Sequence, residues 1–454
     1  MIAPARLAAY EVLRSVASGR VDLGTALATA RRRLPDERDR ALAGEIATGT
    51  LRWQGAFDHV IKAFANRPFT KLDPEVIDIL RLTLFQLLHL DRIPASAAVK
   101  DAVDLTGKMG KRSASGLVNA VLRRVSRDRE RLPLPPAPAN GEDRPAAIAY
   151  LAATLSHPEW LVSRWLERYG FRDTEAWERF NNSPAPLTLR ANTLKTTRDE
   201  LQRTLSAHGV EADAAAHAPD GLVVKSGNPL ATHLDEEGLF VVQDEASQLV
   251  ALYAGARPGE RVLDACASPG GKATAMAAAM DGRGVLVACD VRPRRVDLLA
   301  RTVQRSGATQ VRIVRADATA APPFFVAFDR VLLDAPCSGL GTVRRDPDIK
   351  WRRTADELAV LADAQLLMVR QAASVVTPGG TLIYATCSSE PEENDAVVDR
   401  FLKLDASFRI ARPVSLHPTL EPFVGADGTF RTLPHRHGLE AFFAAMLVRD
   451  KDLR

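Results

Sequence analysis

Two of the four cysteines lie in polar segments that follow short apolar runs. Cys337 belongs to the segment DAPCSG (334–339), and Cys387 belongs to TCSS (386–389). A single cysteine in such a place is usually an inert small hydrophobic residue. Two of them, each beside serine, threonine or aspartate, favour nucleophilic chemistry by a thiolate. We interpret the side chains of Cys266 and Cys289 as structural, because they lie within a glycine turn and an apolar run.

A glycine-rich turn precedes both of these segments in the chain. The stretch DACASPGGK (264–272) follows an apolar run and leads into a helical pattern. Gly270 and Gly271 permit a sharp turn and a close approach of the backbone to a ligand. The stretch is neither the G-x-G-x-x-G fingerprint nor a Walker A loop, which disfavours NAD and ATP.

Acidic residues end three successive strands beyond this turn, namely Asp290, Asp317 and Asp334. A carboxylate about 20 residues beyond a glycine turn can bind ribose hydroxyls, and a second can accept from an adenine amino group. Alternatively, aspartates at strand ends only cap helices. Three in order favour an adenosyl group without phosphates, and therefore S-adenosylmethionine as cofactor. Besides these aspartates, we expect its site to include Cys266, Ala267, Ser268, Pro269, Gly270, Gly271 and Lys272.

A methyl donor beside a cysteine indicates methylation of carbon 5 of a pyrimidine. That carbon is a poor nucleophile, but addition of a thiolate to carbon 6 makes it enamine-like. Asp334, if protonated in a desolvated pocket, could stabilise the adduct at N3. The residues alone leave open which of Cys337 and Cys387 attacks, because we expect both to follow neighbouring strands.

The elements that position these residues predict an α/β domain over residues 251–454. Apolar runs alternate with helical stretches, as in a mostly parallel, doubly wound Rossmann-type sheet that binds ligands at the carboxyl ends of its strands. The strands that we expect are RVLDA (261–265), GVLVACD (284–290), VRIVRAD (311–317), DRVLLDA (329–335) and GTLIYAT (380–386).

The first half of the chain predicts two further domains. Residues 1–130 have apolar residues at helical spacing and no strand alternation, which indicates an all-α domain. Residues 131–145 are proline-rich and predict an extended linker. We expect residues 146–250 to form a small α+β domain, with short strands at 186–190 and 221–225.

Composition bounds the possible partners of this 454-residue chain. Residues 1–130 contain 22 lysines and arginines and 15 acids, a net charge of +7, whereas the remainder has a net charge of −3. This asymmetry suggests a polyanionic partner, although on charge alone a solvated helical surface is favoured.

The four cysteines lack metal-ligand spacing, and the only close histidine pair is His435 and His437, so we expect no metal. No apolar run approaches a membrane span, and the N-terminus does not resemble a signal peptide, so we expect a cytoplasmic protein.

Several of these stretches resemble the NOL1/NOP2/Sun family of RNA cytosine-5 methyltransferases. The paired cysteine motifs are highly specific for it. The matching stretches are PLTLRANTLK (186–195), FVVQDEASQL (240–249), DACASPGGK (264–272), DAPCSGLGTVRRDPDIKW (334–351) and YATCSS (384–389). The first domain resembles NusB-type RNA-binding domains in EIATGTLRW (45–53), LRLTLFQLLHLDRIP (80–94) and LVNAVLRR (117–124). The combination is similar to bacterial enzymes that methylate 16S rRNA.

This resemblance implies roles for individual residues. Cys387 matches the nucleophile, and Cys337 matches the second cysteine, which assists product release. The family's partner is RNA, here 16S rRNA or a small-subunit assembly intermediate, and we expect a monomer. The middle domain would be RRM-like and bind RNA, and the catalytic domain would take a flipped cytosine. The residues that we expect to contact RNA phosphates are Arg344, Arg345, Lys350 and Arg352.

The sequence departs from the family pattern at three places. Ser268 stands where alanine is common, Asp346 replaces a commoner histidine, and Glu440-Ala441 stands where Asp-Gly is usual. The same chemistry on tRNA or at another rRNA site stays open. A non-catalytic RNA-binding assembly factor and a DNA cytosine methyltransferase are less favoured, because both cysteine motifs and the NusB-like segments are present.

Overall fold

The computed structural model describes residues 2–139 and 141–451. The chain divides into two compact units. The first contains the residues up to Pro184 together with Val343–Ala355, and the second contains Ala185–Thr342 and Asp356–Arg454. In the part of the chain that is described, no helix has the length and apolar character needed to cross a membrane.

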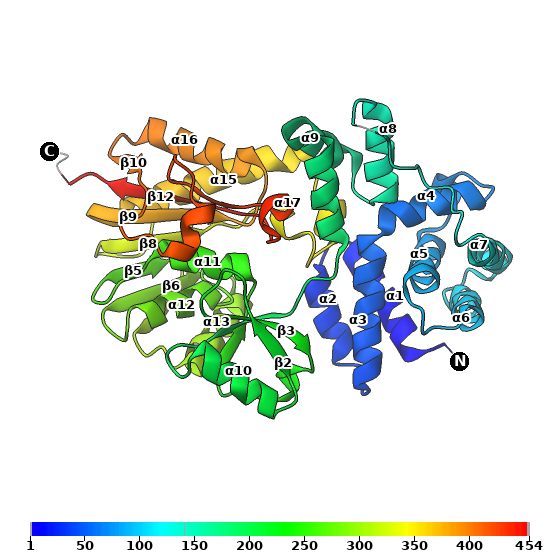
Figure 1. Ribbon diagram of the computed structural model, residues 1–454, viewed down its shortest axis with the longest axis horizontal. Coiled ribbons are helices and arrows are strands. Elements are labelled where there is room, and N and C mark those ends of the chain that lie inside the picture. Colours follow the sequence, from blue (N-terminus) through cyan, green and yellow to red (C-terminus); the bar gives the residue numbers. More distant parts are fainter. Residues whose placement is uncertain (1, 140, 452–454) are drawn as a thin grey trace. The chain divides into compact units, whose positions relative to one another are not determined.

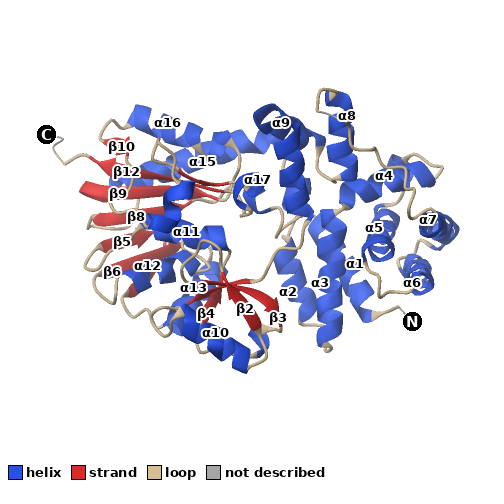
Figure 2. Cartoon of the chain, in the orientation of Figure 1, coloured by secondary structure: helices blue, strands red, loops and turns tan. Residues whose placement is uncertain are grey.

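Among the described residues of the first unit, helices are the only regular elements, as Figure 2 shows. Asp22 caps α2 by accepting from the amide of Thr25, and Pro74 occupies the first turn of α5, where proline costs no hydrogen bond. The helices are α1 (Pro4–Ala17), α2 (Leu23–Arg31), α3 (Glu37–Arg52), α4 (Gln54–Phe64), η1 (Phe69–Lys71), α5 (Pro74–His89), α6 (Ala95–Lys108), η2 (Arg112–Ala114), α7 (Ser115–Arg127), α8 (Arg144–Ala149), η3 (Tyr150–Thr154), α9 (Glu159–Asn182) and α14 (Ile349–Arg352).

The all-α prediction for residues 1–130 is confirmed, but helices α8 and α9 lie in this first unit. The predicted boundary at residue 146 groups α9 with the small α+β domain instead, and this boundary stays a prediction. Only part of the segment 131–145 is an extended linker, because Leu132 and Leu134 pack against the core of helices α1–α7. The sequence pattern alone does not show which core an amphipathic helix will join.

A small antiparallel sheet begins the second unit. Its strands are β1 (Thr188–Ala191), β2 (Glu211–Ala214), β3 (Gly221–Ser226) and β4 (Phe240–Val242), in the order β2-β3-β1-β4. Helix α10 (Arg198–Ala207) joins β1 to β2 and starts at a capping box made by Thr197 and Glu200. Between β3 and β4 lies the short η4 (Pro229–Ala231). This is the predicted α+β domain; sequence analysis had found only two of its strands.

The larger sheet has eight strands, and Figure 1 shows them from β6 to β10 as a twisted layer. Its strands are β5 (Arg261–Asp264), β6 (Val285–Asp290), β7 (Val311–Arg315), β8 (Phe328–Asp334), β9 (Val376–Thr386), β10 (Phe408–Ile410), β11 (Phe430–Thr432) and β12 (Phe442–Arg449). Its helices are α11 (Glu245–Ala254), α12 (Gly271–Ala279), α13 (Pro293–Ser306), η5 (Leu340–Thr342), α15 (Ala355–Ser374), η6 (Pro391–Glu393), α16 (Asp395–Leu404), η7 (Pro418–Phe423) and α17 (Pro434–His437).

The strand order is β10-β12-β9-β8-β5-β6-β7, and β11 pairs with β12. All five predicted strands are present, and their pairings with one another are parallel. Strands β10, β11 and β12 add antiparallel pairings that were not predicted. The strand order reverses between β5 and β8, and in such sheets this point forms a crevice at the carboxyl ends of the strands. The glycine turn follows β5, and the Cys337 loop follows β8.

Candidate active site

The thiols of Cys337 and Cys387 lie next to each other, with their sulfur atoms 3.3 Å apart. The pairing of β8 with β9 explains this, because Asp334 lies opposite Ala385 and each cysteine follows within three residues. Both thiols are partly exposed. The hydrogen bond to Cys387, together with burial, raises the pKa of Cys337 well above its usual range. Either sulfur atom could be the donor of this contact.

An ion pair between Lys272 and Asp334 lies in the same crevice. Lys272 Nζ donates to Asp334 Oδ2 at 2.7 Å. Burial lowers the pKa of Lys272, but Asp334 and the negative charge of a Cys387 thiolate outweigh this, and its pKa is raised. This contact places a cation beside Asp334, and the role of Asp334 at N3 of the base stays a prediction.

The glycine turn between β5 and α12 is closed by its own backbone. The amide of Gly270 donates to the carbonyl of Ala267 at 2.7 Å, and Gly270 has a φ of 109°, which side chains disfavour. The hydroxyl of Ser268 donates to the carbonyl of Arg295 at 2.9 Å. The serine found where alanine is common thus ties the turn to the start of α13.

The three strand-end aspartates have different surroundings. Asp290 is buried, and its Oδ1 accepts from the amide of Arg292 at 3.1 Å. Asp317 is exposed, and it accepts from both the amide and the hydroxyl of Thr319, which lower its pKa. Asp290 and Asp317 therefore each make local hydrogen bonds, but neither caps a helix. Beside Asp317 is a small apolar pocket, lined in part by Ala265, Ala316, Ala318 and Phe324.

Asp264, at the end of β5, provides a test of whether a cationic cofactor fits. Its side chain is fully buried, and apart from the nearby Cys266 amide neither carboxylate oxygen has a partner among the described residues. Burial, followed by the charge of Asp334, raises its pKa to about 7. A buried carboxylate without a partner is costly, and the α-ammonium group of S-adenosylmethionine would supply one. The described residues therefore fit this cofactor.

Two residues that we had not predicted for the site hold the cofactor turn from the small sheet. Arg190, fully buried on β1, donates to the carbonyl of Gly271 and to the hydroxyl of Thr274, the latter at 2.8 Å. It also donates to Gln243 Oε1 at 2.8 Å. A Cβ atom added at Gly271 would lie 3.2 Å from the Gln243 carboxamide. Both residues belong to stretches that carried the family resemblance, which was the available signal.

The departure at Glu440-Ala441 is compatible with the site. The backbones of Gly341 and Ala441 are joined by a hydrogen bond of 2.9 Å, and the amide of Gly341 donates to the carbonyl of Cys387 at 2.9 Å. A Cβ atom at Gly341 would lie 2.0 Å from the Ala441 carbonyl oxygen, so only glycine fits there. Since Ala441 takes part through its backbone, alanine can replace the usual glycine.

The proposed RNA contacts separate into two groups. Lys350 is wholly buried in the first unit, where its Nζ donates to the carbonyl of Arg52 at 2.9 Å. Arg344 lies 4.3 Å over the ring of Phe180 and donates to the carbonyl of Pro184. Our expectation for Lys350 was wrong, because its ammonium has no exposed surface to offer a phosphate. Arg345 is partly exposed and Arg352 is exposed, so both stay candidates.

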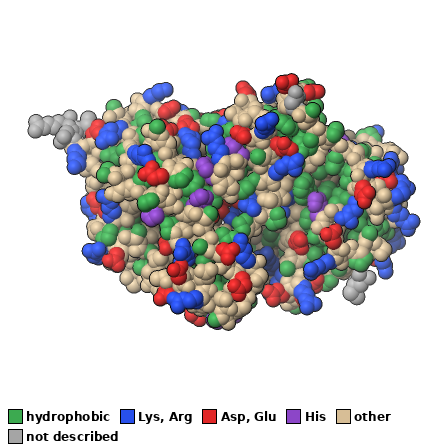
Figure 3. Space-filling view, in the orientation of Figure 1, with side chains coloured by type: hydrophobic (Ala, Val, Ile, Leu, Met, Phe, Trp, Pro, Cys, Tyr) green, Lys and Arg blue, Asp and Glu red, His purple; other side chains and the backbone are tan. Residues whose placement is uncertain are grey.

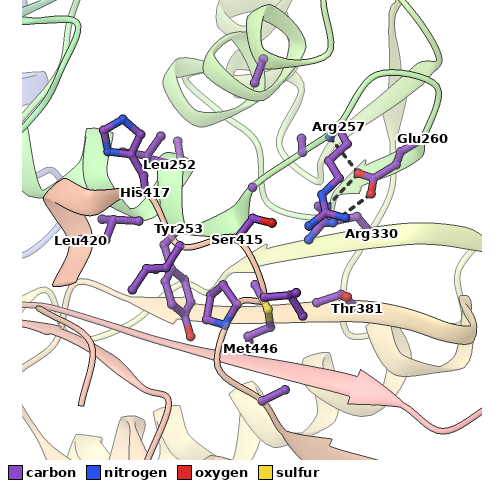
Figure 4. Close-up of a pocket in the computed structure, with 18 of the residues that line it drawn as sticks. Leu252, Tyr253, Arg257, Glu260, Arg330, Thr381, Ser415, His417, Leu420 and Met446 are labelled. Atoms are coloured by element: carbon purple, nitrogen blue, oxygen red, sulfur yellow. Dashed lines mark hydrogen bonds and ion pairs between the residues drawn. The ribbon is translucent and has the colours of Figure 1, made fainter. Parts of the chain in front are cut away.

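A cavity of about 1250 Å³ lies elsewhere in the second unit, as Figure 4 shows. Its lining includes Arg257, Arg330 and Arg412, together with Tyr253 and Met446. It contains none of the cysteines or strand-end aspartates of the site. Arg330 is paired with Glu260 at 2.8 Å and Arg412 is paired with Glu421. Arg190, which holds the cofactor turn, also belongs to its lining, but the cavity does not open on the thiols.

The doubly wound sheet, the glycine turn and the strand-end acids define a methyltransferase of the S-adenosylmethionine-dependent class. A family model described as 16S rRNA methyltransferase RsmB/F matches residues 251–448. The NusB family matches residues 3–127, and a ferredoxin-like domain of RsmF/B-like methyltransferases matches residues 157–231. The RRM-like prediction for the small sheet agrees with the ferredoxin-like match.

Curated relatives match over most of the chain. The chain is 37% identical to the probable ribosomal RNA small subunit methyltransferase B of Bacillus subtilis, over 90% of both chains. It is 36% identical to the ribosomal RNA small subunit methyltransferase B of Pseudomonas putida, over 87% of this chain and 88% of that one. For the Vibrio cholerae protein of the same name, identity is 34% over 98% and 97%. The chain belongs to the ribosomal RNA small subunit methyltransferase B family.

Solved structures agree with this assignment. The crystal structure of PH0851 has a TM-score of 0.80 and 28% identity, over 98% of this chain and 99% of that chain. A methyltransferase homolog protein from Pyrococcus horikoshii has a TM-score of 0.58 and 26% identity, over 67% of this chain and 99% of that chain. The second match covers less of this chain because that protein is shorter.

Proposed function

We propose that the protein methylates carbon 5 of a cytosine in 16S ribosomal RNA, and that Cys387 is the nucleophile. The observation that carries the proposal is the pair of thiols 3.3 Å apart, with the Lys272–Asp334 ion pair in the same crevice. The names of the relatives support the RNA, since they refer to the small ribosomal subunit.

Cys337 is the poorer nucleophile of the two thiols, because the contact with Cys387 and burial raise its pKa well above its usual range. Lys272 interacts electrostatically with Cys387, and Cys387 is also the residue that matches the family's nucleophile. A thiolate stabilised in this way adds through Sγ to carbon 6 of the base. The electron pair of the ring double bond moves toward carbon 5, N3 and O2.

Lys272 and Asp334 have the charges needed to hold the pyrimidine edge. The ammonium of Lys272 can donate to O2, where negative charge develops during the addition. The carboxylate of Asp334 can accept from the exocyclic amino group, which cytosine has and uracil lacks. This pair therefore supports selection of cytosine.

S-adenosylmethionine, when bound, supplies an electrophilic methyl group that a nucleophilic carbon 5 can accept. The backbone of residues 266–272 would hold its methionyl part, and Asp264 would bind its ammonium. Asp290 would take the ribose hydroxyls and Asp317 the adenine edge. Once carbon 5 carries the methyl group, a base such as solvent water takes its proton, the electron pair of that C–H bond re-forms the double bond between carbons 5 and 6, and the bond between carbon 6 and Cys387 Sγ breaks with its electron pair on sulfur. Cys337 then lies beside the leaving thiolate and stabilises it by donating a hydrogen bond.

The test is methyl transfer from tritiated S-adenosylmethionine to 16S rRNA taken from a strain that lacks the corresponding gene. We expect label in the RNA and one additional bisulfite-resistant cytosine. Label without such a cytosine would exclude carbon 5, and label in tRNA alone would exclude the rRNA substrate. No transfer to any RNA would favour a non-catalytic assembly factor. Competition by DNA would test the remaining alternative.

A further inference from the structure

One buried carboxylate, that of Glu393, bonds to the loops of both cysteines. It ends η6, and none of its surface is exposed. Oε1 accepts from the backbone amide of Ser338, the residue after Cys337, at 2.7 Å. Oε2 accepts from the hydroxyl of Ser388, the residue after Cys387, at 2.5 Å.

We propose that Glu393 is a positioning residue that fixes the two thiols beside each other and keeps them chemically unequal. This rests on the proposed function in one respect, which is that Cys387 is the thiol that attacks. Glu393 itself touches neither sulfur through a hydrogen bond. It acts through the two serines, one in each loop.

Glu393 is itself held in place by hydrogen bonds from two other elements. Its fixed position can therefore fix the positions of the two cysteine loops. Gln365, on α15, donates to Glu393 Oε1 and to the carbonyl of Pro336, both at 3.0 Å. The hydroxyl of Tyr384, on β9, donates to the backbone carbonyl of Glu393 at 2.5 Å. Movement of either cysteine loop would break one of these bonds. In such a buried network, each unmade bond is costly.

The charge of Glu393 has no cationic partner in the part of the chain described. Its donors are an amide N–H, a hydroxyl and a carboxamide, all neutral groups. The carboxylate therefore keeps a negative field on the nearer thiol. The hydrogen bond to Cys387 is the main cause of the raised pKa of Cys337, burial adds to it, and the charge of Glu393 adds further. Glu393 therefore disfavours ionisation of Cys337.

The other charged and titratable groups around the thiols do not repeat this role. Lys272 is positive and acts on Cys387, whereas its partner Asp334 is negative. Tyr384 is neutral at ordinary pH, because burial raises its pKa. Of these groups, only Glu393 bonds to the residues that follow both cysteines.

The test is alkylation of the full-length protein by iodoacetamide without RNA, followed by mass spectrometry of the Cys337 and Cys387 peptides across pH. In the wild type we expect Cys387 to react faster. In Glu393→Gln we expect the ratio of Cys387 to Cys337 labelling to fall by about tenfold, the size of one lost hydrogen bond to a charged group. The midpoint for Cys337 should also move to lower pH, because a negative neighbour has been removed. Glu392→Gln, in the same short helix, is the matched control.

A role in fold stability alone would lower the melting temperature of Glu393→Gln and leave the labelling ratio unchanged, which would overturn the proposal. If Glu393→Gln does not fold, Ser388→Ala decides, since it removes only one of the two arms. A ratio in Ser388→Ala equal to that of the wild type would then overturn the proposal, and a lower ratio would support it. Alkylation needs no RNA, so its result is independent of whether the protein methylates cytosine.

Discussion

Arg190 on the small sheet donates a hydrogen bond to the carbonyl of Gly271, at the start of the helix that follows the cofactor turn. This arginine is fully buried, and desolvation lowers its pKa to about 10. Burying a cation costs free energy of desolvation. The hydrogen bonds of Arg190 to Gly271, Thr274 and Gln243 must offset that free energy. The small sheet therefore does more than extend the molecule, because it fixes the backbone that meets the cofactor.

Arg190→Lys should weaken binding of S-adenosylmethionine by about tenfold, because one ammonium cannot reproduce the fork of bonds that a guanidinium makes. Calorimetric titration of the folded variant measures this. The control is Arg203→Ala, which removes an exposed arginine from α10 of the same domain. Equal affinities for Arg190→Lys and the wild type would show that the turn keeps its shape without this clamp.

The raised pKa of Asp264 predicts that binding of the cofactor is coupled to the release of a proton. Its pKa of about 7 means that it holds a proton below that pH in the free protein. If the cofactor ammonium pairs with the carboxylate, binding must release this proton. Affinity should then fall as pH falls below about 7, by at most about tenfold per pH unit. Calorimetry at pH below 7 in buffers of different ionisation enthalpy counts the proton released.

Asp264→Asn should abolish this release, because an amide does not titrate. Asp317→Asn is the contrasting control: its carboxyl has a lowered pKa, so that variant should lose affinity but still release the proton. The same linkage acts on stability. Between about pH 4 and pH 7 the folded state binds a proton that the unfolded state has lost, so Asp264 makes the free protein less stable as pH rises. Release that persists in Asp264→Asn would assign the proton to another group.

The sequence alone was sufficient to predict the parallel strands and the proximity of the two cysteines, for a physical reason. Strands β5, β6, β8 and β9 contain short apolar runs that end in polar residues, and this pattern is typical of a doubly buried sheet. Strand β12 is also a continuous apolar run, but a run alone does not distinguish a strand from a buried helix. Strands β10 and β11 have only three residues each, which is too short for a periodic signal.

The parts that sequence analysis missed depend on contacts between distant segments. Lys350 lies in a basic stretch, and only the helices packed around it show that it is buried. Arg190 and Gly271 are 81 positions apart, and Glu393 and Ser338 are 55 apart. No local pattern encodes such pairs. The same reason explains why the ion pair of Asp334 was not predicted, since its partner Lys272 is 62 positions away.

The α6–α7 face of the first unit should contribute to RNA affinity. Lysine and arginine side chains gather where α6 and α7 lie (Figure 3), and a groove of about 770 Å³ between these helices includes Lys100 and Arg123. Replacing both by glutamine should lower affinity for a 16S rRNA fragment and reduce the salt dependence by about two counterions. The control is the double variant Arg32→Gln with Arg38→Gln. It makes the same change in net charge on two exposed residues, one directly after α2 and one in α3. Binding measured over a range of salt concentrations distinguishes the two pairs, and equal slopes for both would assign no special role to the groove.

The last prediction concerns the two thiols, which are close enough that distance alone does not assign their roles. If Cys387 attacks carbon 6, Cys387→Ala forms no covalent bond to RNA and makes no product. Cys337→Ala can still attack and accept the methyl group, but it lacks the donor that stabilises the departing thiolate. Elimination should therefore stall and leave a protein–RNA adduct that survives denaturing gel electrophoresis. Cys289→Ala, a buried cysteine on β6, is the control and should show neither effect. An adduct that accumulates in Cys387→Ala and not in Cys337→Ala would reverse the assignment, and normal turnover in both variants would show that the thiols are only packed side by side.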